Sequence, residues 1–179
     1  MEVCKKAGTR ILLPRLSESL RVMTMTRAQQ LLAEYSADHR HPVNETLHRL
    51  CVPAIVVSLL GLLWSLPVPG FADGMPRIAN WATLALIAAL AWYLSMSLRL
   101  GVGMVLVAAA ALGIVAALAQ LAAPLWMSSI AIFTVAWVGQ FIGHGYEGKR
   151  PSFMRDLRFL LVGPMWLLAG AYERLGIRV

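Results

Sequence analysis

Long runs of apolar residues, separated by short connections, dominate the chain. Four of them come close to the ~20 residues that an α-helix needs to cross the hydrocarbon core of a membrane. They cover residues 50–67, 78–98, 102–122 and 125–143. A fifth run, residues 159–172, contains Gly163 and Pro164 and is too short to span, which favours an interfacial or re-entrant helix. The pattern predicts an all-α integral membrane bundle of four transmembrane helices with one additional short helix.

Each connection between the four runs carries residues that favour turns. The first is rich in proline and glycine from Pro67 to Pro76, the second contains Arg99 and Gly101, and the third ends at Pro124. We therefore expect a loop at each of these places.

The N-terminal residues differ from the rest of the chain. Residues 1–24 scatter basic residues among apolar ones without the order of a signal peptide, and we expect a flexible tail there. An amphipathic surface helix over the same residues is the alternative. Thr26 is placed to cap a short helix that reaches Tyr35. Residues 25–179 are expected to form a single membrane-embedded helical domain.

Composition and charge agree with a membrane protein. The sequence is 59% hydrophobic and 14% charged, whereas soluble domains are about 25% charged. Between Leu50 and Tyr146 the charged residues are Asp73, Arg77 and Arg99. The net charge of +7 therefore lies mainly in the flanks of the apolar region, where it indicates a cytoplasmic face and not nucleic-acid binding. With four crossings, both termini are expected on that face.

The four histidines of the chain all lie outside the apolar runs. His39, His41 and His48 stand shortly before the first run, and His144 follows the fourth. Because an even number of crossings returns the chain to the side from which it started, we expect these residues to meet at one membrane surface. The alternative is that they are interfacial histidines, solvated or bonded to lipid headgroups.

Helical spacing brings polar partners next to two of the histidines. Pro42 interrupts a preceding helix and favours a new one that starts at Pro42 or Val43. Within that helix Asn44 and His48 are four residues apart, so that Asn44 can orient His48 or act as a polar ligand. The end of the fourth run offers a second group with spacings of four and three: Gln140, His144 and Glu147.

This combination of side chains predicts a metal site. Imidazole together with carboxylate suits Fe(II), Zn(II) or Mn(II). Cys4 and Cys51 form no paired metal motif, so a cysteine-rich zinc or iron–sulfur site is not expected. Because all four histidines fall on one predicted face, we favour metal binding over solvated histidines.

Two motifs in these regions resemble those of a known family. They are Tyr35-x3-His39-x4-Asn44-x3-His48, followed by Pro53, and Gln140-Phe141-Ile142-Gly143-His144-x2-Glu147-x3-Pro151. They are similar to the family of the fungal endoplasmic-reticulum 2-hydroxy fatty acid dioxygenase and its bacterial relatives, over roughly residues 35–173. The resemblance implies a membrane enzyme that uses Fe(II) and O2 to shorten a 2-hydroxy fatty acid by one carbon (α-oxidation), releasing the carboxyl carbon. The expected location is a bacterial inner membrane.

The resemblance also assigns residues. It makes His39, His48 and His144 the iron ligands, and we place Glu147 with them among the catalytic residues. Other polar residues are expected near the substrate or the ligands: Tyr35, His41, Asn44 and Gln140. The family pattern commonly has asparagine at the position of His41, which leaves its role open. Arg49 or Lys149 is expected to hold the substrate carboxylate. Membrane lipid is a further expected partner, and homo-oligomer formation is left open.

Three other functions are alternatives to the dioxygenase. A zinc-dependent membrane hydrolase would employ these histidines and be indifferent to O2, and a bis-histidine haem protein would show a Soret band. A non-enzymatic carrier or scaffold has weaker support, because no crossing contains the buried ionisable residue expected along an ion path.

Overall fold

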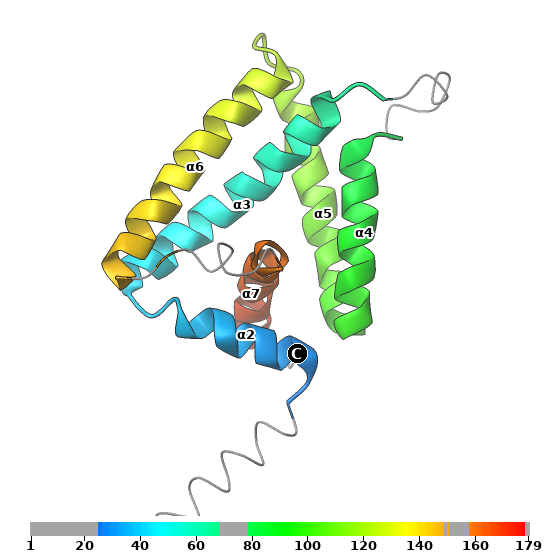
Figure 1. The fold of residues 1–179 in the computed structure, drawn as a ribbon. Coiled ribbons are helices and arrows are strands. Elements are labelled where there is room, and N and C mark those ends of the chain that lie inside the picture. Colours follow the sequence, from blue (N-terminus) through cyan, green and yellow to red (C-terminus); the bar gives the residue numbers. More distant parts are fainter. Residues whose placement is uncertain (1–24, 69–78, 149, 151–157, 178–179) are drawn as a thin grey trace, which may run out of the picture.

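The computed structural model describes residues 25–68, 79–148, 150 and 158–177, and it is all-helical over these ranges (Figure 1). Its helices are α2 (Arg27–Ala37), α3 (Pro42–Ser65), α4 (Trp81–Met96), α5 (Leu98–Leu118), α6 (Leu125–Glu147) and α7 (Phe159–Arg174). The predicted all-α class is confirmed. The expected tail, residues 1–24, lies outside the described residues, and the single-domain organisation stays a prediction.

Local capping sets where the first two helices begin. Thr26 precedes α2 and exchanges hydrogen bonds with Gln29 in a capping box, which confirms the predicted start. Pro42 is the first residue of α3, as the sequence predicted, and the His41 side chain accepts a hydrogen bond from the backbone N–H of Val43. The short linker between α2 and α3 is thereby fixed at the end where α3 begins.

Among the described residues, three helices are long and apolar enough to cross a membrane, namely α3, α5 and α6, so the predicted four spans are not all confirmed. The second predicted span is the shorter helix α4, which has 16 residues. Asn80 caps α4 by accepting hydrogen bonds from the backbone N–H groups of Ala82 and Thr83, and Ser97 is extended at its other end. The helix therefore covers less of the apolar run than its hydropathy suggested.

The second connection is tighter than predicted. Ser97 alone separates α4 from α5, so Arg99 and Gly101 lie in the first turn of α5 and not in a loop. A Cβ atom added to Gly101 would lie 2.2 Å from Cδ2 of Leu94 on α4. This glycine is needed for the close approach of two helices, whereas the sequence pattern suggested that it makes a turn.

Helices α3 and α6 form a long antiparallel pair, seen side by side in Figure 1. A Cβ atom at Gly139 of α6 would lie 2.6 Å from Cys51 Sγ, and one at Gly143 would lie 2.6 Å from Asn44 Oδ1. These contacts place the end of α6 against the beginning of α3. The backbones approach closely because glycine carries no side chain at the crossing points.

Helix α7 is packed against the other helices. Val162 and Met165 are fully buried. The hydroxyl of Tyr93 on α4 donates to the carbonyl of Leu161, and the hydroxyl of Tyr172 donates to the carbonyl of Arg99 on α5. The extent predicted for this helix, residues 159–172, agrees with Phe159–Arg174. Its interfacial or re-entrant position in a membrane stays a prediction.

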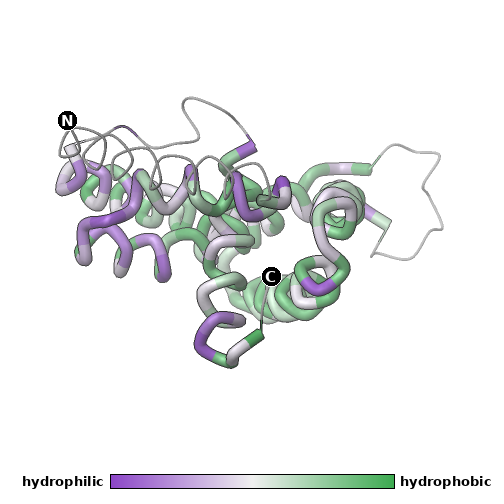
Figure 2. The backbone as a smooth tube through the Cα atoms, turned by 90° about the horizontal axis from the view of Figure 1, so that it is seen from below, coloured by the Kyte–Doolittle hydropathy of each residue, from purple (hydrophilic) through white to green (hydrophobic). Residues whose placement is uncertain are grey.

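Much of the surface is apolar. In Figure 2 hydrophobic colouring covers most of the helices, and the hydrophilic colouring is restricted to a few stretches. Large side chains such as Leu106 and Val135 are 70% and 73% exposed. Such a surface on helices of spanning length indicates association with a membrane. The orientation of the termini stays a prediction.

Candidate metal centre

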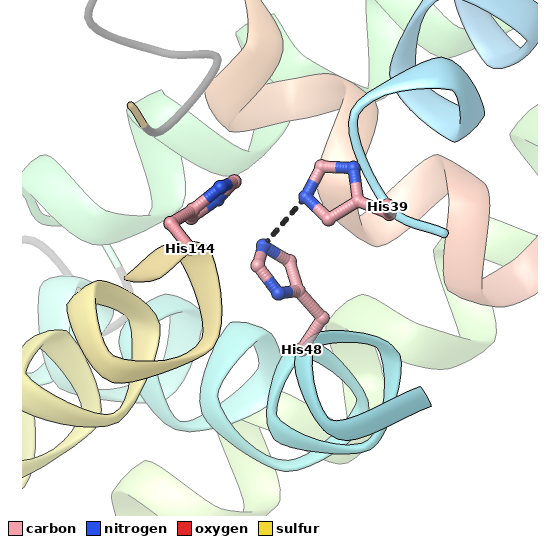
Figure 3. A group of neighbouring side chains, drawn as sticks. All are labelled: His39, His48 and His144. Atoms are coloured by element: carbon pink, nitrogen blue, oxygen red, sulfur yellow. Dashed lines mark hydrogen bonds between the residues drawn. The ribbon is translucent and has the colours of Figure 1, made fainter. Parts of the chain in front are cut away.

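Three of the four histidines come together at one end of the α3–α6 pair. His39 lies in the linker between α2 and α3, His48 in the second turn of α3, and His144 in the last turn of α6. Figure 3 shows their side chains converging from these three elements. One ring nitrogen from each lies within 4.8 Å of the others. Of the four histidines that we expected to meet, these three do so, whereas His41 is not part of the group.

Burial separates these three residues from solvated interfacial histidines. The exposed fractions of His39, His48 and His144 are 5%, 2% and 3%. Burying a polar ring is costly unless its nitrogen atoms find partners. The partners of these rings therefore indicate what the site can hold.

Backbone carbonyls fix the tautomers of two rings. His39 Nδ1 lies 2.6 Å from the carbonyl oxygen of Tyr35, and His48 Nδ1 lies 3.1 Å from that of Asn44. Because a carbonyl can only accept, each Nδ1 carries the proton, and in the neutral rings each Nε2 offers a lone pair. Both lone pairs point into the site, as the second nitrogen of a metal-binding histidine requires.

The arrangement of these lone pairs fits a cation. The two Nε2 atoms of His39 and His48 are 2.8 Å apart, the pair marked by the dashed line in Figure 3. Two nitrogen ligands bound at about 2.1 Å in neighbouring positions of one metal ion are about 3 Å apart. In addition, the buried Nδ1 atom of His144 has no hydrogen-bond partner. A metal ion would satisfy all three rings, and a donor set of three imidazoles suits Fe(II) or Zn(II).

Glu147 connects the site elements but lies outside the histidine group. Its carboxylate accepts hydrogen bonds from the backbone N–H groups of Arg40 and His41 and, at 3.2 Å, from the Asn44 side chain. It thus ties the linker that carries His39 to the end of α6. Its predicted part in catalysis stays a prediction.

Other predicted residues support the ligands. Asn44 is fully buried, and its backbone carbonyl accepts the hydrogen bond that orients His48. The Tyr35 ring stacks on His39 with centroids 4.1 Å apart. Burial, and secondarily the charge of Asp38, raises the pKa of the Tyr35 phenol, so that it stays protonated. Gln140 is also buried and lines the adjoining cavity.

Two predicted residues, His41 and Arg49, are not at this site in the described structure. His41 caps α3 and stacks on Tyr146, with centroids 5.2 Å apart. Arg49 forms an ion pair with Glu45, four residues before it, and neither residue is among those that line the cavity with the histidines. Lys149 lies outside the described residues.

An apolar cavity of about 850 Å³ adjoins the three histidines. Its walls come from α3, α4, α5, α6 and α7, and its lining includes Val52, Leu90, Met104 and Leu167. Arg158, just before α7, also lines it. Arg158 could not be predicted from the sequence, because only the packing of α7 brings this flanking residue to the cavity.

The fold and site together define a helical, membrane-associated protein in which three buried histidines, placed so that they could hold a metal ion, lie beside an apolar cavity. A family model described as "2-hydroxy-palmitic acid dioxygenase Mpo1-like" matches residues 25–175. The chain therefore belongs to the Mpo1-like family, which confirms the family resemblance of its two motifs. No curated protein and no solved structure matches the chain significantly.

Proposed function

We propose that the protein is an Fe(II)-dependent dioxygenase that shortens 2-hydroxy fatty acids by one carbon. The observation that carries this proposal is the placement of three convergent, buried imidazoles at a large apolar cavity. The family description, which names a dioxygenase of 2-hydroxy-palmitic acid, supports the same reaction. An amphiphile with a chelating polar head and a long apolar chain matches both parts of the site.

The proposed reaction balances without a further reductant. A 2-hydroxy acid R–CH(OH)–COOH and O2 give the acid R–COOH, CO2 and water. The bond between the carboxyl carbon and the hydroxyl-bearing carbon breaks, and the latter becomes the new carboxyl carbon. The substrate supplies all the electrons that reduce O2, so that no separate 2-oxo acid is required.

His39, His48 and His144 would hold the ferrous ion. Bound there, Fe(II) supplies open coordination positions at which O2 and the oxygen atoms of the hydroxy acid can meet. The carbonyls of Tyr35 and Asn44 keep the two Nδ1 protons in place and thus keep both Nε2 atoms available as ligands.

Arg158 is our candidate for the substrate carboxylate in place of Arg49, and Lys149 stays a prediction. Among the described residues that line the cavity, it carries the permanent positive charge. A guanidinium group binds a carboxylate with two parallel hydrogen bonds. The apolar walls then receive the acyl chain and exclude water from the reacting end.

Oxygen dependence separates this proposal from a zinc hydrolase. Purified protein is loaded anaerobically with Fe(II) or Zn(II) and given a 2-hydroxy fatty acid with or without O2. We expect the acid one carbon shorter and CO2 only with iron and O2 together. The same assay is applied to His39→Ala, which removes a proposed ligand and should abolish turnover. His41→Ala is the matched control and should keep its turnover, because His41 lies outside the histidine group. Turnover by the zinc form without O2 would refute the proposal.

A further inference from the structure

The cavity extends along most of the length of α3. His48 lines it near the beginning of the helix and Leu63 near its end, fifteen residues later. At about 1.5 Å per residue this corresponds to about 22 Å. The cavity is therefore much longer than a metal site alone requires.

A cluster of apolar side chains closes the end remote from the histidines. There α3, α4 and α5 meet through the buried residues Leu60, Ala82, Ala111 and Val115. Leu63 and Leu86 pack against this cluster and also line the cavity. At this level the helices are in contact, and we take this cluster as the end of the space available to a chain that enters from the histidine end.

One face of α5 follows the cavity from end to end. Met104, Ala108 and Ala111 are spaced four and three residues apart, and all three line the cavity and are buried. Met104 belongs to the buried cluster around Tyr35, whereas Ala111 belongs to the cluster that closes the far end. Two small side chains thus leave the distal half of the cavity open.

We infer that this cavity measures the acyl chain, with Ala108 and Ala111 as residues that determine specificity; the inference rests on the proposed function. An extended chain advances about 1.25 Å per carbon, which follows from a C–C bond of about 1.52 Å and an angle of about 111°. About 22 Å of helix therefore accommodates about 18 carbons. A larger side chain at Ala108 should shorten the accepted chain by about four carbons more than one at Ala111, three residues further along α5.

Leucine substitutions at these positions test the inference. Saturated 2-hydroxy acids of 10 to 18 carbons are compared by kcat/KM for the wild type, Ala108→Leu and Ala111→Leu. We expect the preferred length to fall in both variants and further in Ala108→Leu, with at least about a tenfold loss for the longest acids. Ala109→Leu is the control, because Ala109 is exposed and is not among the lining residues.

A binding measurement keeps the test independent of turnover. The dissociation constants of the corresponding fatty acids without the hydroxyl group, followed by tryptophan fluorescence, should show the same shift in length preference. Ala108→Val and Ala111→Val provide milder substitutions should leucine disturb folding. Equal length preferences in the wild type and all variants would overturn the inference. Normal length-dependent binding without O2-dependent turnover would instead refute the proposed function.

Discussion

The α3–α6 pair and the α4–α5 hairpin are both antiparallel helix pairs, but they contribute differently to the site. Glycines bring α3 and α6 into close contact, and this pair supplies His48 and His144 at one end. The α4–α5 hairpin meets α3 in the apolar cluster around Leu60 and Ala111 and lines the cavity elsewhere. Under the proposed function, metal binding would depend on the α3–α6 pair together with the linker that carries His39, whereas the α4–α5 hairpin would shape the space for the substrate.

The largest effect is expected from removal of a ligand. His48→Ala should abolish iron binding and oxygen-dependent turnover, because its lone pair faces that of His39 across the site. Iron content per chain, measured by elemental analysis, checks this expectation. The control variant His41→Ala removes a histidine at the end of the linker between α2 and α3, and this variant should retain its iron.

The second-largest effect on iron binding is expected from a substitution that separates α3 from α6. A methyl group at Gly143 would lie 2.6 Å from Asn44 Oδ1 and 3.3 Å from Asn44 Cα, so Gly143→Ala should force the pair apart. We expect iron affinity to fall between about tenfold and a hundredfold. Gly145→Ala is a matched control two residues away, because a Cβ there meets nothing within 4 Å. Equal iron affinity in the two variants would show that this contact does not position the ligands.

A smaller effect is expected at Glu147. Glu147→Ala removes the acceptor that holds the backbone of Arg40 and His41, so the linker carrying His39 should loosen and iron affinity should fall about tenfold. Glu147→Gln keeps one acceptor oxygen and should recover part of the loss. Metal titration of both variants tests this. If glutamine restores iron affinity but not turnover, the carboxylate takes part in catalysis, as we predicted.

The smallest effect on the metal is expected in the α4–α5 hairpin. Gly101→Ala places a methyl group against Leu94 and should lower the free energy of unfolding by about 2 kcal/mol. Iron affinity should stay unchanged, because neither residue touches the histidines. Gly113→Ala, which meets nothing within 4 Å, controls for the substitution itself. A loss of iron in Gly101→Ala would show that the two pairs are coupled.

The sequence was sufficient for the parts of the site that follow from helical spacing. Pro42 set the start of α3, and spacings of three and four placed Asn44 beside His48 and Gln140 beside His144. Antiparallel packing of α3 and α6 then brought both groups to one end. These features depend on local helix geometry and on the order of the helices, and both can be predicted from the sequence.

Other features depended on tertiary packing. Gly101 looks like a turn residue in the sequence, but its role is to let α4 approach α5. Nothing in the spacing of Glu147 shows that its carboxylate accepts backbone N–H groups from a linker about a hundred residues away. Arg158 reaches the cavity only because α7 packs between the other helices.

The central claim is that His39, His48 and His144 hold one ferrous ion. X-ray absorption spectroscopy of the iron-loaded protein tests it most directly, because the scattering pattern distinguishes imidazole, sulfur and porphyrin ligands. We predict one non-haem iron per chain with three imidazole nitrogen atoms at about 2.1 Å. A sulfur ligand, a porphyrin, or an unchanged spectrum after His144→Ala would contradict the account.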